Sequence, residues 1–295
     1  MKLGLHLNDF DWVGGAARLG PTLAEIARAG DEAGFDRIGV ADHFWRSHYM
    51  GSVEGPELAC YTTLGFLAAN TRRAKLTAMV TAATYRPPGL LAKIVTTLDV
   101  LSSGRAWLGL GAGDYEAEAR GLGLPFPPLN ERFEMLEETL RICLRMWDGE
   151  HGDDRPYQGQ HFQLGRTLNV PQSLTRPHPP ILLGGSGDKT LRLVARYADA
   201  CNIRPGPDIP QKLETLRRFC DEEQRDYAAI EKTCPFAFDM GEDGTDGKKV
   251  GDLLGQLRWL AGMGIQTVIG FVPHVDRITP LEVLGREVIP AAAGL

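Results

Sequence analysis

Short apolar runs bounded by Gly, Pro or Asp recur along the chain, and longer segments with helical spacing separate them. Most of the short runs lack strict in-and-out alternation, which is typical of strands covered on both faces. Eight runs are predicted to be strands: residues 2–7, 37–41, 75–82, 106–111, 180–184, 200–203, 233–238 and 267–271.

The segments between these runs carry apolar residues three or four positions apart, as amphipathic helices do. The pattern is clearest in residues 130–147, where one face consists of Phe133, Leu136, Leu140, Leu144 and Trp147. Pro21 near a first turn and Gly34 as a left-handed cap predict another helix. Weaker patterns predict helices at 88–101, 189–197, 210–227 and 249–263.

Strands that alternate with helices predict parallel pairing with right-handed crossovers. Eight such units close most economically into a (β/α)8 TIM barrel, and a doubly wound open sheet is the alternative. A polar, proline-rich stretch at 149–180 interrupts the rhythm between the fourth and fifth strands, and 157–164 within it predicts a small hairpin. We therefore expect one α/β barrel domain over residues 1–295, with 149–180 as an insertion segment.

Composition narrows the classes of protein that remain. Hydrophobic residues make up 43% and charged residues 24% of the 295 residues, which excludes a disordered chain or a coiled coil. Thirty-two basic against 38 acidic residues give a net charge of −6, so no nucleic-acid partner is expected. No apolar stretch approaches the roughly 20 residues of a membrane helix, and the start lacks a signal peptide's apolar core. We expect a cytoplasmic protein without membrane association.

Cysteine and histidine spacing gives no sign of a metal site. The five cysteines are scattered and form no CxxC pair, and the histidines show no paired ligand spacing such as HxxxH. Neither a disulfide framework nor a bound metal is therefore expected.

Polar residues directly after the strands are the candidates for chemistry, because the active site of a parallel barrel forms at the carboxyl ends of its strands. Asp42 and His43 follow the second strand. Asp42 could accept hydrogen bonds from the N–H groups of a heterocycle, and His43 could supply a proton near the reacting atom. The alternative is that Asp42 caps a turn and His43 is an ordinary surface histidine.

Glycine-rich segments follow two further strands. The run that ends at Gly113 precedes Asp114, which would point into the mouth, but it lacks the third glycine of a dinucleotide fingerprint. The run 184–187 leads into a helix, where exposed N–H groups could bind an anion. A tight connection without a ligand is the alternative for this second run.

Several motifs strongly resemble the bacterial luciferase-like monooxygenase superfamily and, within it, the coenzyme F420-dependent oxidoreductases. The motifs lie at 42–44, 88–105, 108–113, 131–133, 157–164 and 182–187. The likeness fades from Gly206 onward. The resemblance implies a TIM barrel, bound F420 and hydride transfer at ring carbon C5 of this deazaflavin. It also implies a homodimer, since relatives are often dimers.

The resemblance further implies which residues contact the cofactor. Asp42 and His43 would lie beside the deazaflavin ring, and a non-proline cis peptide at Met79–Val80 would support the ring from behind. The implied cofactor contacts are Asp42, Met79, Val80, Ala82, Ala112, Gly113, Gly184, Gly185, Ser186 and Gly187. His43 or Asp114 would exchange a proton with the substrate. Some sugar-phosphate dehydrogenases of this family carry Glu where this chain has Asp114 and Trp where it has Ser47, which sets this chain apart from that substrate class.

Aromatic residues near the strand ends predict the character of the substrate. Trp12, Trp45 and Tyr115 lie in such positions together with Phe10 and Phe44, which indicates a small apolar or conjugated organic molecule. Two alternatives to an F420-dependent enzyme remain at this point. One is an FMN-dependent monooxygenase on the same barrel, and the other is a non-catalytic barrel relative.

Overall fold

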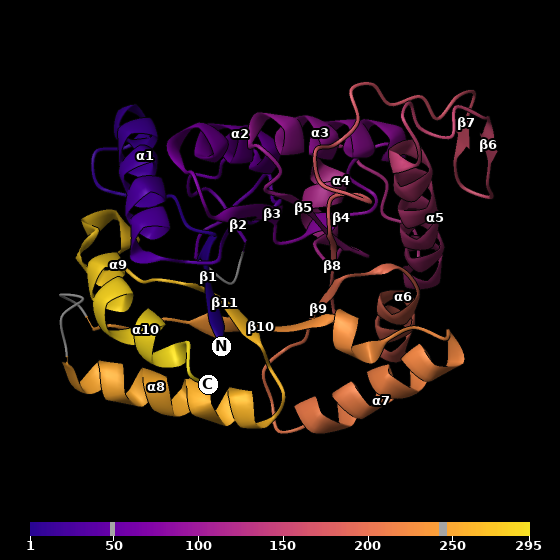
Figure 1. Cartoon of the computed structure of the whole chain (residues 1–295). Coiled ribbons are helices and arrows are strands. Elements are labelled where there is room, and N and C mark those ends of the chain that lie inside the picture. Colours follow the sequence, from indigo (N-terminus) through magenta and orange to yellow (C-terminus); the bar gives the residue numbers. More distant parts are fainter. Residues whose placement is uncertain (48–50, 242–246) are drawn as a thin grey trace.

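The computed structural model describes residues 1–47, 51–241 and 247–295, and its main sheet is a closed ring of parallel strands (Figure 1). The strands of this ring are β1 (Lys2–Leu7), β2 (Arg37–Val40), β3 (Lys75–Ala78), β4 (Thr81–Ala82), β5 (Ala106–Gly111), β8 (Ile181–Gly184), β9 (Ala200–Asn202), β10 (Glu231–Ala237) and β11 (Thr267–Phe271). Their order is β3-β2-β1-β11-β10-β9-β8-β5-β4, and pairing of β3 with β5 closes the ring. The expected (β/α)8 barrel is confirmed, and the open sheet is wrong.

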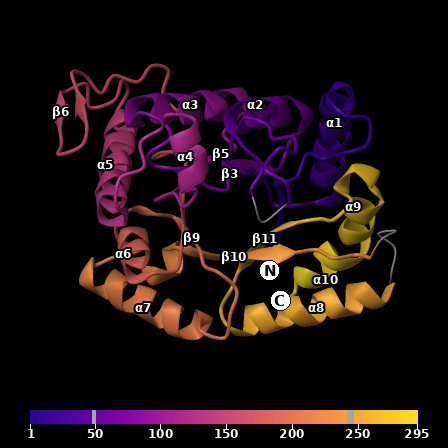
Figure 2. The same cartoon turned by 180° about the vertical axis from the view of Figure 1, so that it is seen from behind.

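Helices surround this ring on its outside (Figures 1 and 2). They are α1 (Ala16–Ala33), α2 (Cys60–Asn70), α3 (Pro88–Leu101), α4 (Glu116–Gly121), α5 (Leu129–Trp147), α6 (Asp188–Tyr197), α7 (Ile209–Glu222), α8 (Gly247–Gly262), α9 (Thr279–Val283) and α10 (Ile289–Ala292). Short 3-10 turns at Tyr227–Ala229 and Val275–Arg277 and a π turn at Leu284–Val288 complete the connections. None of the helices in the described ranges is both long and apolar enough to cross a bilayer.

The structure corrects several predicted boundaries. The predicted strand 75–82 is two segments, β3 and β4, because the chain departs from the ladder at Met79–Val80. Helix α1 begins at Ala16, so Pro21 lies inside the helix, although Gly34 is the left-handed cap that was expected. The predicted helix 210–227 ends at Glu222. The predicted hairpin is present as β6 (Tyr157–Gln158) paired with β7 (Gln163–Leu164).

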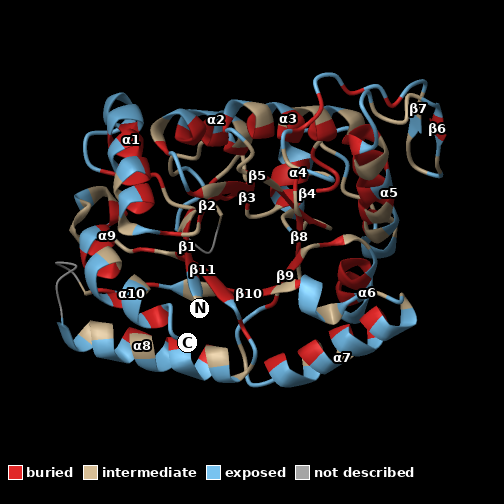
Figure 3. Cartoon of the chain, viewed as in Figure 1, coloured by how far each residue is buried: buried red, intermediate tan, exposed pale blue. Residues whose placement is uncertain are grey.

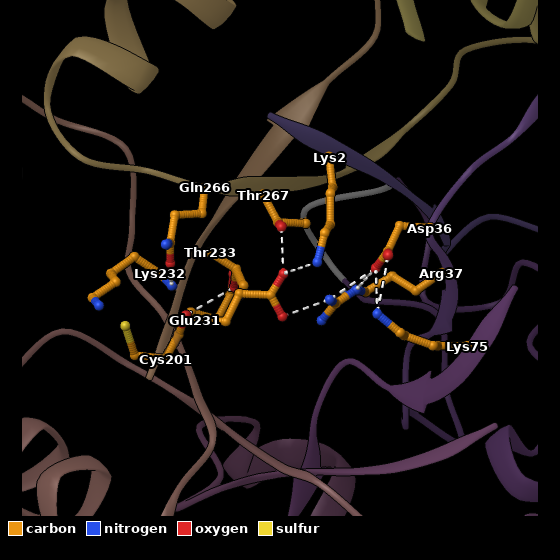
Figure 4. A network of polar contacts seen from close by, with 11 residues as sticks. Lys2, Asp36, Arg37, Lys75, Cys201, Glu231, Lys232, Thr233, Gln266 and Thr267 are labelled. Carbon is orange, nitrogen blue, oxygen red and sulfur yellow. Dashed lines mark hydrogen bonds and ion pairs between the residues drawn. The ribbon is translucent and has the colours of Figure 1, made fainter. Parts of the chain in front are cut away.

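A charged network fills the barrel interior at the amino ends of the strands (Figure 4). The Arg37 side chain is fully buried, and it donates to Glu231 at 2.7 Å and to Asp36 at 2.9 Å. Lys75 donates to Asp36 at 3.0 Å, and the Trp107 ring centre lies 4.5 Å from the Arg37 guanidinium carbon. Figure 3 shows that the strands around this network are largely buried. The active site of a parallel barrel forms at the opposite end, where the strands have their carboxyl ends.

Glycines face the barrel interior near the carboxyl ends of the strands. At this level the chain between β3 and β4 projects inward. A Cβ atom on Gly109 would overlap the backbone carbonyl oxygen of Ala78. A Cβ atom on Gly111 or on Gly184 would come within 3.0 Å of the Cγ2 atom of Val80. These positions lack side chains because the inward-projecting chain occupies the space that side chains would need.

We predict that Gly109→Ala destabilises the protein by more than about 3 kcal/mol, because the new methyl group collides with backbone that cannot rotate away. Thermal or urea unfolding followed by circular dichroism measures the effect. Gly255→Ala is the matched control, since a Cβ atom at this helical glycine meets nothing within 4 Å. The control should gain about 0.5 to 1 kcal/mol. Equal stability of the two variants would contradict the proposed close approach.

Candidate active site

The candidate residues from separate strands gather at one end of the barrel. Asp42 and His43 follow β2, Asp114 follows β5, and Gly185 follows β8. These strands are parallel members of one closed ring, so their carboxyl ends share one rim. The negative charge of Asp114 acts on the pKa of His43, which places these two predicted catalytic residues near each other.

The carboxylate of Glu118 on α4 organises the loop that carries His43. Its side chain is fully buried, and its Oε1 atom accepts the backbone N–H groups of Phe44 at 2.6 Å and Trp45 at 2.8 Å. Its Oε2 atom accepts the Tyr85 hydroxyl and lies 3.2 Å from His43 Nδ1. Burial alone would raise the pKa of Glu118, but these hydrogen bonds lower it. Glu118 is therefore an ionised anchor that the sequence analysis missed.

The same carboxylate controls the protonation of His43. Burial alone would lower the pKa of His43, but the hydrogen bond and charge of Glu118 raise it, with help from the charges of Asp114 and Glu57. The imidazole meets the ring of Tyr115 edge to face at 5.7 Å between centres. Because Nδ1 faces Glu118, Nε2 is the nitrogen that can exchange a proton with a ligand.

Asp42 forms a bidentate ion pair with Arg86. The Asp42 carboxylate is fully buried, its Oδ1 atom accepts Arg86 Nη2 at 2.9 Å, and its Oδ2 atom accepts Nη1. The guanidinium carbon of Arg86 also lies 4.8 Å from the ring centre of Tyr61 and 5.6 Å from that of Phe44. Both oxygens of Asp42 thus already have a charged donor, and a contact between Asp42 and a cofactor stays a prediction.

The segment between β3 and β4 forms a floor at the mouth of the barrel. The peptide Met79–Val80 is cis, as the resemblance implies. Ala82 and Gly113 meet beside it, since a Cβ atom on Gly113 would lie 3.0 Å from the Cβ of Ala82. Gly113 has a φ of +81°, a conformation that glycine adopts easily. Ala112 lies between β5 and this turn and is half-buried.

The glycine run after β8 lies where a helix begins. Gly185 has a φ of +128°, and its N–H donates to the carbonyl of Asn202 at 3.2 Å. The Ser186 hydroxyl accepts the backbone N–H of Arg204 at 3.1 Å. Gly187 directly precedes α6, so its neighbouring N–H groups lie at a helix amino end. Contact of Gly184 to Gly187 with a cofactor phosphate stays a prediction.

The predicted substrate residues differ in how far they are available to a ligand. Trp12 is 9% exposed and packs against Phe10, with 5.5 Å between ring centres. The ring of Trp45 lies against Gly121 of α4, where it fills the space of a missing Cβ atom. Tyr115 is half-buried and faces His43. The Trp45 ring is therefore largely used in packing against α4, whereas Tyr115 lies at the rim beside His43.

Glu57 is a second acidic residue that the sequence analysis missed. Burial raises its pKa to about 7, against the opposing effects of the Leu58 N–H group and the charge of His43. The sequence offers no motif around Glu57, because it lies in an irregular segment before α2. Among the described residues, no group of three or more His, Cys, Asp or Glu side chains could hold a metal ion.

Fold and site together define a closed parallel barrel whose ligand-binding mouth contains an imidazole, several carboxylates and a glycine-bordered backbone floor. Residues 10–246 match the sequence model of the family described as luciferase-like monooxygenase. The chain belongs to this family, and the resemblance noted from its motifs is confirmed.

Two relatives named F420-dependent glucose-6-phosphate dehydrogenase have comparable similarity. The protein from Nakamurella multipartita is 32% identical over 194 residues, which are 64% of this chain and 54% of the relative. The protein from Kineococcus radiotolerans is 29% identical over 228 residues, which are 75% of this chain and 64% of the relative. The chain therefore spans only about half to two thirds of the length of these relatives.

Solved structures share the whole barrel at lower sequence identity. An F420-dependent secondary alcohol dehydrogenase in complex with an F420-acetone adduct superposes with a TM-score of 0.80 at 16% identity, covering 99% of this chain and 98% of that one. The monooxygenase RslO1 from Streptomyces bottropensis gives a TM-score of 0.80 at 18% identity, covering 98% and 99%. These likenesses extend the agreement in fold to the strands beyond residue 246.

We predict that Glu118→Gln lowers the pKa of His43, because the amide keeps a hydrogen-bonding oxygen but removes the negative charge. A raised histidine pKa stabilises the fold below the unfolded-state pKa, and this contribution is lost as the pH rises through the folded-state pKa. The variant should therefore lose stability at pH 5 to 6 more than at pH 8. NMR titration of the His43 ring and unfolding at both pH values measure these effects.

Glu116→Gln is the matched control for this test. Glu116 lies on the same short helix, pairs with Arg120 at 2.6 Å, and is 55% exposed. Its loss should change stability by less than about 0.5 kcal/mol and leave the His43 titration unaltered. An unchanged His43 pKa in Glu118→Gln would contradict the role assigned to this carboxylate.

Proposed function

We propose that this protein is a coenzyme F420-dependent oxidoreductase, which transfers a hydride between C5 of the deazaflavin ring and a small organic substrate. The observation that carries the proposal is the backbone floor at Met79–Val80, bordered by glycines at the mouth of the barrel. Relatives at about 30% identity named as F420-dependent dehydrogenases support the choice of cofactor.

The floor fits a flat heterocycle. Gly111 and Gly184 let the Val80 side chain pack directly against their backbone, since a Cβ atom at either position would come within 3.0 Å of it, and Val80 itself stays half-buried. Gly113 allows the chain to turn away beside Ala82. A planar ring can therefore lie on Val80 without meeting side chains from the neighbouring strands. Met79, Ala82 and Ala112 would complete this surface.

The charged tail of the cofactor fits the run from Gly184 to Gly187. The run leads directly into α6, whose first N–H groups have no partner within the helix, as at other anion sites on helix amino ends. The exposed Arg204 adjoins the run, since its backbone N–H donates to the Ser186 hydroxyl. Asp42, paired with Arg86, would hold the loop after β2 against the ring's polar edge.

The chain's own residues place the substrate and handle its proton. When bound, F420 supplies two-electron hydride chemistry at C5. Nδ1 of His43 donates to the ionised Glu118, so Nε2 is the nitrogen that gains or loses the exchangeable proton, and the charge of Asp114 also favours the protonated ring. One of these two groups accepts a proton from a substrate that is oxidised, or donates one to a substrate that is reduced. Tyr115 limits the ring motion of His43.

We also propose a homodimer that forms through α3 and the insertion segment. Leu90 and Leu101 on α3 are 53% and 71% exposed, and eleven residues place them on one helix face. Lys93 of α3 donates to the carbonyl of Val170, so the exposed Val170 and Leu174 adjoin this face. Burial of such a contiguous apolar surface favours association.

The dimer is tested by light scattering during gel filtration. The wild-type protein should have about twice the mass of the chain, and Leu101→Glu with Leu90→Glu should give monomers, because buried carboxylates oppose the interface. Leu122→Glu, at an exposed leucine on another element, is the control and should remain dimeric. A monomeric wild-type protein at micromolar concentration would refute the proposal.

The cofactor proposal is tested by titrating the purified protein with F420 and with FMN while following cofactor fluorescence. F420 should bind at least about tenfold more tightly than FMN, and Gly184→Val should weaken F420 binding by at least tenfold, because the new side chain collides with Val80 and displaces it from the floor. Gly65→Val on α2, where a Cβ atom meets nothing within 4 Å, is the control. Preference for FMN would favour a flavin-dependent monooxygenase, and binding of neither would favour a non-catalytic barrel.

A further inference from the structure

A small cavity opens at the carboxyl ends of β1 and β11. Its volume is about 240 Å³, below the 300 to 1,000 Å³ common for drug-sized ligands. His6 and Trp12 line one side, and residues 271–276 line the other. The cavity therefore suits a compact molecule with few heavy atoms.

The register of β1 places the His6 side chain on the interior face of the barrel. His6 pairs with Gly39 of β2, and Gly4 on the same face would, with a Cβ atom, meet Arg37 and Ile269 of neighbouring strands. Leu5, on the opposite face, lies close to Gly30 of α1. Because successive side chains of a strand alternate between faces, His6 is directed inward above Gly4.

The imidazole of His6 has an unused polar atom. Its Nε2 atom is buried and has no hydrogen-bond partner among the described residues. Burial and the positive charge of His43 lower the pKa of His6 to about 4, so the ring is neutral at physiological pH. Leaving a buried polar atom unpaired costs about 1 to 3 kcal/mol, and a ligand in the adjoining cavity can remove this cost.

The charges around the cavity exclude anions. Its lining contains the carboxylates of Asp9, Asp11 and Asp276 but neither lysine nor arginine. Arg46 pairs with Asp9 at 2.8 Å and with Asp11 at 3.3 Å, so one positive charge faces two carboxylates and Asp276 adds a third. The lining keeps an excess of negative charge, which opposes entry of a phosphate ester.

We propose that His6 is a specificity-determining residue that binds the oxygen atom of an uncharged alcohol, or of the corresponding carbonyl compound, and that phosphate esters are rejected. This inference rests on the proposed hydride transfer, which interconverts the two forms. A neutral imidazole serves both, because Nε2 accepts from a hydroxyl in one tautomer and donates to a carbonyl in the other. The neighbouring His43 stays available for proton exchange.

The test compares the wild-type protein with His6→Leu, His6→Gln and the control His151→Gln, which changes an exposed histidine of the insertion. Cyclohexanol, propan-2-ol and glucose 6-phosphate are offered with oxidised F420, and KM and kcat are measured. F420 affinity is measured separately by fluorescence. In cofactor-free protein, the Nε2 resonance of His6 is followed by NMR as each alcohol is added.

His6→Leu should raise KM for the alcohols by roughly tenfold or more while F420 affinity stays within twofold, because one hydrogen bond to substrate is lost. His6→Gln should recover part of this loss, and His151→Gln should resemble the wild-type protein. Both alcohols should shift the His6 resonance. Glucose 6-phosphate should neither react nor compete.

The inference is overturned if His6→Leu leaves KM unchanged, if neither alcohol shifts the His6 resonance, or if glucose 6-phosphate is preferred. Failure of the wild-type protein to bind F420 would instead overturn the proposed function. In that case the cofactor-free NMR measurement still decides whether His6 binds an alcohol oxygen.

Discussion

The geometry of the site depends on one buried negative charge, the carboxylate of Glu118. It accepts hydrogen bonds from the backbone of Phe44 and Trp45 and from the Tyr85 hydroxyl, and it faces the ring of His43. Four donors on two loops are thus held by one short helix after β5. Because the anchor is charged, it positions the imidazole and also raises its pKa. Placement and protonation of His43 therefore have a common cause.

The barrel interior divides into two halves with different chemistry. Ion pairs between Arg37, Glu231 and Asp36 fill the amino end, and the stacking of Arg37 on Trp107 completes its packing. At the carboxyl end, glycines leave space for the inward-projecting Val80. A barrel interior is otherwise filled by layers of side chains, so at this end a backbone segment takes the place of part of such a layer.

Much of the fold could be predicted from the sequence, because strands buried on both faces are short apolar runs; 2–7, 106–111 and 267–271 match β1, β5 and β11 in full. Helix α2 was missed because CYTTLGFLAAN is apolar nearly all round and has no polar face to reveal its period. Asp42, His43 and Asp114 were predicted at the rim from their position after strands alone, and their chemical roles stay predictions. Glu118 and Glu57 were not, because a carboxylate's partners depend on tertiary contacts. The strand face of His6 could be predicted from the sequence, since Lys2, Gly4 and His6 alternate with Leu3, Leu5 and Leu7.

The match to the family model includes some parts of the candidate site and leaves others outside it. The family match covers residues 10–246, which include the Val80 floor, the Glu118 anchor and the run that begins at Gly184. His6 and the cavity wall at 271–276 lie outside it. The match therefore spans the floor, the anchor and the glycine run but only part of the cavity, since Asp11 and Trp12 fall inside it and His6 outside. Parallel pairing of β1 with β11 brings the walls of this cavity together at the carboxyl end of the ring, so the fold creates a cavity from segments that are far apart in the sequence.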